Sequence, residues 1–147
     1  MRVLGSGDAA VLDRVAPGVL DRGIVARLAA EFLGDPRHHI AVAIEDGTVV
    51  AFASGVHYVH PDKPTELWIN EVAVAPSHRG RGLSKAMLRE MLALAERLGC
   101  TEASVLTDRA NEPAMRAYAA VGGIESPPQI MYTFRLHGRA RPRTEAD

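Results

Sequence analysis

The chain has 147 residues, 47% of them hydrophobic, and a formal net charge of −1 at pH 7. This length fits one ordinary globular domain. A charge near zero excludes a general attraction to nucleic acid or to an anionic membrane surface. Cys100 is the only cysteine, which excludes an intrachain disulfide and a cysteine-built zinc site. Without a leader pattern or an apolar run of about 20 residues, we expect a soluble cytoplasmic protein with no nucleic-acid or membrane partner.

The first third of the chain predicts two helices. Asp8 can cap a short helix that runs through Val15, and Asp21 can cap a second one that ends at residues 34–36. The apolar residues of the second helix recur at helical spacing, and they are Ile24, Val25, Leu28, Ala29 and Phe32.

From Ile40 onward the sequence changes to the period of a sheet. Residues 40–45 and 48–59 flank an Asp-Gly pair, which is typical of a β-hairpin turn. After a turn-rich stretch, residues 66–75 predict a third strand.

The second half of the chain predicts a long amphipathic helix over residues 83–98 that Gly99 terminates. A strand over 102–108, a short helix beginning near Glu112 and a last strand over 129–136 follow. This order predicts a mixed α/β (α+β) sheet with helices on its faces. We expect a single domain over residues 1–136 and a polar, disordered tail over 137–147.

The loop before the long helix reads VAVAPSHRGRGLS over residues 72–84. Gly80 and Gly82 let the main chain approach a ligand closely, Arg79 and Arg81 add positive charge, and free N–H groups at a helix start attract anions. The loop is therefore a candidate phosphate site. A solvated loop or an RG-type RNA contact remains an alternative at this point. The Walker pattern GxxxxGK[ST] is absent, and one crossover does not build a dinucleotide fold.

A second motif, NEPAMRAYAAVG over residues 111–122, carries a resemblance. Asn111, Ala114, Tyr118 and Gly122 have the spacing Asn-x-x-Ala-x-x-x-Tyr-x-x-x-Gly, which resembles the GNAT N-acetyltransferase superfamily.

The loop motif VAVAPSHRGRGLSKAML resembles the acyl-coenzyme A loop of the same superfamily, Arg/Gln-x-x-Gly-x-Gly/Ala. Arg79 and Gly82 match this pattern, while Ser84 replaces its final small residue. Two motifs in the expected order, separated by a helix and a strand, are more specific than either alone.

The resemblance implies a mostly antiparallel twisted sheet with helices on both faces, in which two central parallel strands splay apart around acetyl-coenzyme A. The backbone of Val72, Ala73 and Val74 would pair with the pantetheine arm like an added strand. Asn111 and Ala114 would lie against this arm. The pyrophosphate would be held by Arg79, Gly80, Arg81, Gly82, Leu83 and Ser84.

The resemblance also implies catalytic residues. Tyr118 would protonate the leaving thiolate, and its alternative is a core tyrosine. Glu71 lies between apolar residues, so partial burial would raise its pKa toward that of a useful base. Its alternative is a solvent-facing strand glutamate. The histidines do not form a metal-binding set, and we assign no metal.

The stretches over residues 32–74, 78–83 and 107–118 resemble the small GNAT-type aminoglycoside 3-N-acetyltransferases that modify gentamicin. Polycationic substrates need carboxylates, which Glu66, Asp108 and Glu112 could supply beside Glu71, although a solvated acidic rim is the alternative. We therefore expect transfer of an acetyl group to a primary amine of a small molecule. A protein lysine or N-terminus as the acceptor, and a non-catalytic acyl-coenzyme A binding module, remain open. Since superfamily members are often dimers, a homodimer also remains open.

Overall fold

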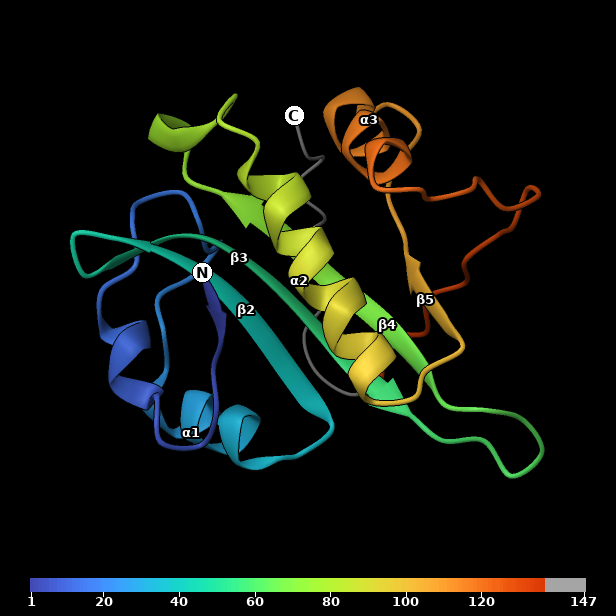
Figure 1. Cartoon of the computed structure of the whole chain (residues 1–147), viewed down its shortest axis with the longest axis horizontal. Coiled ribbons are helices and arrows are strands. Elements are labelled where there is room, and N and C mark those ends of the chain that lie inside the picture. The colour runs from blue at the N-terminus through green and yellow to red at the C-terminus, as the bar shows by residue number, and fades with distance from the viewer. Residues whose placement is uncertain (137–147) are drawn as a thin grey trace.

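The computed structural model describes residues 1–136, and within them five strands form one sheet in the order β1-β2-β3-β4-β5 (Figure 1). The strands are β1 (Arg2–Val3), β2 (His38–Glu45), β3 (Thr48–Tyr58), β4 (Glu66–Val74) and β5 (Glu102–Val105). The helices are α1 (Ala26–Gly34), α2 (Leu83–Arg97) and α3 (Glu112–Ala120), with the 3-10 turns η1 (Ala9–Asp13) and η2 (Pro76–His78). Neighbouring strands are antiparallel except for the parallel pair β4 and β5.

The hairpin between β2 and β3 forms where the Asp-Gly pair predicts it. Asp46 and Gly47 both have positive φ, at 50° and 72°. This is the backbone that a two-residue turn with the right twist requires, and Glu45 pairs with Thr48 across it.

Helices cover both faces of the sheet, as expected. In β2, Ala41 and Ala43 belong to a buried cluster with the α2 residues Met87 and Met91, whereas alternate residues of the same strand face the other way. The alternate residues belong to a second buried cluster, on the face that η1 and α1 cover. It contains Leu4, Leu12, Val19, Leu33, Ile40, Val42, Val49, Phe52 and Ala75. The period of two therefore sorts one strand into two cores.

A bulge interrupts β4 at its middle. Ser54 of β3 pairs with Glu71 and Gly55 pairs with Ile69, which leaves Asn70 as the extra residue. Gly55 is needed here because a Cβ atom would lie 2.7 Å from the backbone oxygen of Trp68. An extra residue shifts the alternation by one position, so Glu71 lies on the face of Ala73, toward η1 and α1.

The predicted side-chain caps of the first two helices do not form. The α1 helix begins at Ala26, and its N-cap residue is Val25 instead of Asp21. Residues 21–25, between the predicted cap and the helix, are exposed, whereas Val19 just before them is buried. Asp8 does hold the N-cap position of the short η1, but its carboxylate makes no capping bond and instead accepts hydrogen bonds from the Gly5 N–H and from Arg2.

The predicted last strand over residues 129–136 does not form, and β5 ends at Val105 instead of continuing to residue 108. The parallel pair consequently lies at the edge of the sheet and not at its centre, while the unpredicted β1 adds the other edge. An alternating pattern shows that a segment can pair, but not that a neighbouring strand is within reach. The expected tail at 137–147 lies outside the described residues. Within residues 1–136, no helix is long and apolar enough to cross a membrane.

Candidate active site

The parallel strands β4 and β5 separate after a short pairing. They pair from Glu66 with Glu102 to Ile69 with Val105, and β4 then continues to Val74 with β3 as its only strand neighbour in the described sheet. Figure 1 shows the two strands diverging toward the end that carries α3. Val72, Ala73 and Val74 therefore lie on a stretch of β4 whose second edge has no strand beside it, as the resemblance implies for a coenzyme arm.

The loop after β4 forms a backbone site that suits an anion. Gly80 and Gly82 have φ of 75° and 77°, and a Cβ atom at either would meet nothing within 4 Å. The first bond of α2 runs from the Ala86 N–H to the Gly82 oxygen. In the described structure the N–H groups of Leu83 and Ser84 have no acceptor. Free N–H groups at the positive end of a helix dipole bind phosphate well.

The two loop arginines have different surroundings. Arg81 donates to the Glu45 carboxylate at 3.0 Å, and His78 Nε2 lies 3.1 Å from the same oxygen. Sequence reasoning did not anticipate this link, because Glu45 lies on the β2–β3 hairpin. Arg79 forms no ion pair with any described residue and is therefore the more available of the two cations.

The α3 helix positions Tyr118. Asn111 caps the helix as predicted, with its side-chain oxygen accepting from the Ala114 N–H at 3.2 Å. Tyr118 is half-buried and packs against the α2-side core. Burial raises the pKa of its hydroxyl, so the phenol is neutral near pH 7 and can donate a proton.

Glu71 lies beyond the bulge on the opposite face of the sheet. Glu71 is one of the exposed residues of β4, and the partial loss of water around its carboxyl raises the pKa, which the negative charge of Asp21 raises further. Asp21 was predicted to cap a helix and instead contributes to the field at Glu71. No pattern in the sequence links positions so far apart, because the tertiary fold alone brings them near each other.

The remaining predicted carboxylates divide into two groups. Glu66 lies at the start of β4, away from the diverging ends of the strands, so its predicted place at the opening is wrong. It accepts a hydrogen bond from the Tyr58 hydroxyl at 3.0 Å, which lowers its pKa, and lies 3.3 Å from His60. Asp108 lies just before α3 and Glu112 is its first residue, and Asp108 accepts from the Ala110 N–H at 2.8 Å.

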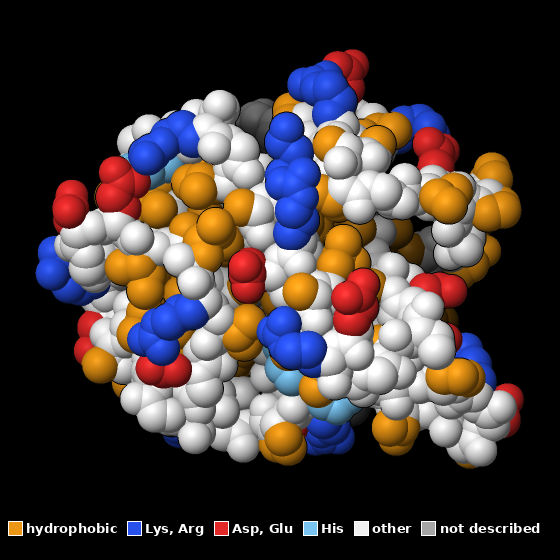
Figure 2. Space-filling model, in the orientation of Figure 1, with side chains coloured by type: hydrophobic (Ala, Val, Ile, Leu, Met, Phe, Trp, Pro, Cys, Tyr) orange, Lys and Arg blue, Asp and Glu red, His pale blue; other side chains and the backbone are white. Residues whose placement is uncertain are grey.

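The charges near this site are mixed in sign. Glu112 is exposed and pairs with Arg116 at 3.3 Å. Figure 2 shows basic and acidic side chains interspersed on the face that carries α2, without a continuous patch of one sign. In the described part of the chain, no cluster of three or more histidine, cysteine or acidic side chains could hold a metal ion.

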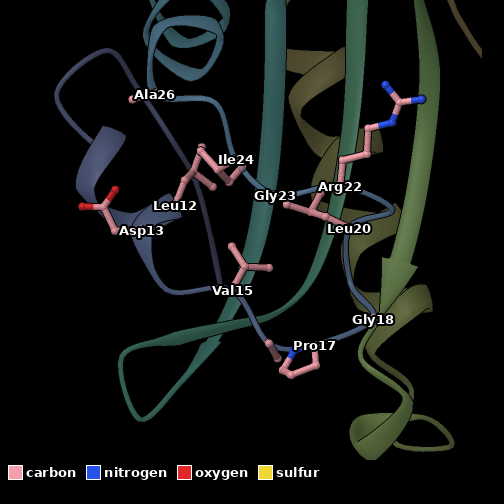
Figure 3. A pocket seen from close by; sticks show the side chains of 11 residues that line it. Leu12, Asp13, Val15, Pro17, Gly18, Leu20, Arg22, Gly23, Ile24 and Ala26 are labelled. Carbon is pink, nitrogen blue, oxygen red and sulfur yellow. The ribbon is translucent and has the colours of Figure 1, made fainter.

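A cavity of about 460 Å³ lies elsewhere, between η1 and the start of α1. Figure 3 shows Leu12, Leu20 and Ile24 around it, while the Arg22 side chain extends away toward β4. None of the predicted site residues lines this cavity. Its lining combines apolar side chains with the charged Asp13 and Arg22.

Comparison with known proteins identifies the family. Residues 14–122 match the acetyltransferase (GNAT) family. The chain belongs to the GNAT family. This confirms the resemblance carried by the two motifs, and acetyl-coenzyme A is the acetyl donor of this family.

Individual relatives of this GNAT chain differ in their acceptors. It is 34% identical to N-alpha-acetyltransferase RimI of Mycobacterium tuberculosis over 90 residues, which are 61% of this chain and 54% of that protein. It is 47% identical to L-2,4-diaminobutyric acid acetyltransferase of Virgibacillus pantothenticus over 51 residues, 35% of this chain and 31% of that one. The chain thus matches between about a third and just over half of the length of these relatives.

The fold also agrees with solved structures. Aminoglycoside N-acetyltransferase AAC(6')-Iy in complex with CoA superposes with a TM-score of 0.71 at 22% identity, over 92% of this chain and 93% of that one. At this identity the match concerns the fold, and it confirms the mixed α/β architecture.

Proposed function

We propose that this protein transfers an acetyl group from acetyl-coenzyme A to a primary amine of a small molecule. One observation carries the proposal: β4 runs unpaired on one edge beyond Ile69 and leads directly into a loop with free N–H groups at the start of α2. An extended coenzyme arm needs the first feature, and its pyrophosphate needs the second.

In this proposal the protein holds the coenzyme mainly with backbone groups. Val72, Ala73 and Val74 pair with the pantetheine arm, and the amides of residues 79–84 bind the pyrophosphate. The open space at Gly80 and Gly82 fits this role, because a side chain there would occupy the position of the ligand. Arg79 supplies charge without first breaking an ion pair.

The chemistry requires an acceptor for one proton and a donor of another. The nitrogen lone pair attacks the thioester carbonyl carbon, a C–N bond forms, and the C–S bond breaks. Glu71 takes the proton from the amine, directly or through water, and its raised pKa strengthens it as a base. Tyr118 donates its hydroxyl proton to the departing thiolate, since its phenol is neutral near pH 7.

For the acceptor, the finer proposal is an aminoglycoside, modified at its 3-N position. Its support is the motif resemblance together with the carboxylates of Glu71, Asp108 and Glu112, to which the structure adds Asp21. The site is less acidic than expected, because Glu66 lies at the far end of β4 and Glu112 is paired.

A second candidate is the N-terminal amine of a protein. The 34% identity to N-alpha-acetyltransferase RimI favours it, since that relative is named for this reaction. The two candidates share the coenzyme site and differ only in what approaches the face of β4 that carries Glu71.

The test is a kinetic comparison of gentamicin, 2,4-diaminobutyrate and an alanine-terminated peptide, with free thiol as the readout. We expect the small amines to be acetylated with a higher kcat/KM than the peptide. Efficient turnover of the peptide alone would replace the small-molecule acceptor with a protein terminus. Tight coenzyme binding without thiol release on any amine would support a binding module.

The role of Glu71 is tested with Glu71→Gln. Turnover should fall most at pH values above the pKa of Glu71 and below that of the amine, where the amine is protonated and the ionised carboxylate of the wild type frees its lone pair. Glu66→Gln is a matched control, because it makes the same change at the other end of β4 and should leave turnover unchanged. An equal loss in both variants would show a general effect of charge instead of base catalysis.

A further inference from the structure

A tight turn lies between η1 and α1, at residues 16–19. Its sequence is Ala16-Pro17-Gly18-Val19, and the Val19 N–H donates to the Ala16 oxygen at 3.3 Å. Gly18 has a φ of 76°. Proline at the second position and a glycine with positive φ at the third are typical of a type II turn. These four residues therefore favour the turn by themselves.

The fold holds this turn on the side of β3. The Ala16 N–H donates to the Val49 oxygen at 2.8 Å, and the Val49 N–H donates to the Arg14 oxygen at 2.8 Å. At the other end of the turn, Val19 is 3% exposed and belongs to the same buried cluster as Ala75. Backbone hydrogen bonds before the turn and a buried side chain at its end thus fix its position.

The tip of the turn packs against the first residue of the coenzyme loop, which we define as residues 76–84. A Cβ atom at Gly18 would lie 2.9 Å from Cδ and 3.0 Å from Cγ of Pro76. Figure 3 shows Pro17 and Gly18 beside the chain that leaves β4. Only a residue without a Cβ atom allows this approach, so a side chain at this position would push the turn and the loop apart.

Pro76 determines how the coenzyme loop begins. It is the first residue of η2, and the Ala75 N–H before it donates to the Val50 oxygen at 2.8 Å. The His78 N–H donates to the Ala75 oxygen at 2.8 Å, and the Arg79 N–H donates to the Pro76 oxygen at 3.5 Å. A displacement of Pro76 would therefore also displace Arg79, where the amides proposed to bind the pyrophosphate begin.

We propose that the turn of residues 16–19 positions the coenzyme loop, with Gly18 as the positioning residue. Gly18 does not touch the coenzyme and acts through its contact with Pro76. The inference rests on the proposed function, because it takes the loop to be the pyrophosphate site. The chain leads on from this turn to Asp21, whose negative charge raises the pKa of Glu71. One turn thus supports both the coenzyme side and the acceptor side of the proposed site.

The contact is tested by calorimetry of coenzyme A binding to the full chain. Gly18→Ala should raise the dissociation constant at least about fivefold, within the range found for residues in contact, since the methyl group pushes against Pro76. Gly99→Ala is the matched control: the φ of Gly99 is 74°, and no described atom lies within 4 Å of the added Cβ atom. It adds similar backbone strain and should bind coenzyme A as the wild type does. Equal affinities in the two variants would show that the turn moves aside without the loop and would overturn the proposal.

An exchange of side-chain size separates this contact from general strain. Pro76→Ala removes the Cγ and Cδ atoms that the new methyl group would meet. The double variant Gly18→Ala/Pro76→Ala should therefore recover most of the affinity that Gly18→Ala loses. A loss that persists in the double variant would contradict a role through Pro76.

Two-dimensional NMR spectra of the free protein give a readout that needs no ligand. The amide signals of residues 77–84 should move in Gly18→Ala and stay in place in Gly99→Ala. Pro76→Ala leaves the φ of Gly18 unchanged and should move the same signals, so the test stands even where Gly18→Ala does not fold. Unchanged loop signals would overturn the inference alone. Loop signals that move, in a protein whose wild type does not bind coenzyme A, would support the positioning role and overturn the proposed function.

Discussion

The two sides of β4 are held in very different ways. Toward β2 and β3 the sheet consists of antiparallel strands of eight, eleven and nine residues, and the central residues of β2 and β3 are buried on both faces. Toward β5 the pairing covers only four residues before the strands separate. The first side provides most of the buried surface, whereas the second leaves backbone groups free.

This difference explains where a site can form. Pairing with β3 on the antiparallel side fixes the backbone of Glu71, and open backbone on the β5 side can accept a ligand. Functional segments commonly come from the less stable part of a fold, supported by a rigid scaffold. The following predictions test this division in order of decreasing effect.

The largest effect is expected on the open side, at Tyr118. Tyr118→Phe keeps the ring packed and removes only the hydroxyl. General acid catalysis contributes about 10²–10⁴-fold, so kcat should fall within that range while coenzyme affinity stays nearly constant. Tyr58→Phe is the control, because this hydroxyl binds Glu66 at the other end of the sheet. A fully active Tyr118→Phe enzyme would make Tyr118 a packing residue only.

The next effect concerns the rigid side, at Gly55. In Gly55→Ala the new Cβ would lie 2.7 Å from the Trp68 oxygen and 3.0 Å from Met91. Overpacking of this kind costs about 1–3 kcal/mol, so urea denaturation should show a lower free energy of unfolding. Gly34→Ala, where nothing lies within 4 Å, should change it little. Equal stability of the two variants would mean that the bulge does not depend on Gly55.

A matched pair of glycines separates ligand approach from backbone strain. Gly82 and Gly99 stand at opposite ends of α2, with φ of 77° and 74° and open space around both. Alanine at either position should cost about 1 kcal/mol of stability. Only Gly82→Ala should weaken coenzyme A binding in calorimetry, by roughly tenfold, because its side chain meets the pyrophosphate. Equal affinities in the two variants would contradict the loop assignment.

The smallest effect is expected at the ion pair between Glu45 of β2 and Arg81 of the loop before α2. Glu45→Gln removes the charge that holds Arg81, so coenzyme A should bind up to about fivefold more tightly at low salt, the range that an exposed ion pair allows. Glu31→Gln breaks the exposed Arg27–Glu31 pair and serves as the control. Weaker binding by the Glu45 variant would show that Glu45 positions the loop instead of competing for Arg81.

Local signals were sufficient where a few neighbouring residues decide the structure. The Asp46-Gly47 turn, the long helix with its stop at Gly99 and the Asn111 cap form as predicted, because each depends on backbone angles or hydrogen bonds within a few positions. The two spaced motifs likewise identified the GNAT family. Patterns of this kind also placed the candidate coenzyme loop between a strand and a helix.

Contacts between distant positions were decided by the tertiary structure alone. The α1 helix starts at Ala26, away from Asp21, and the folded chain places the charge of Asp21 near Glu71. Pairing with β5 places Glu66 at the end of β4 that lies away from the proposed site. The fold also brings Glu45 of β2 to Arg81 of the loop before α2. Residues 129–136 alternate as the residues of a strand do, but a strand also needs a neighbouring strand edge with which to pair. Whether such an edge is within reach depends on where the rest of the chain, or a second copy, lies in space.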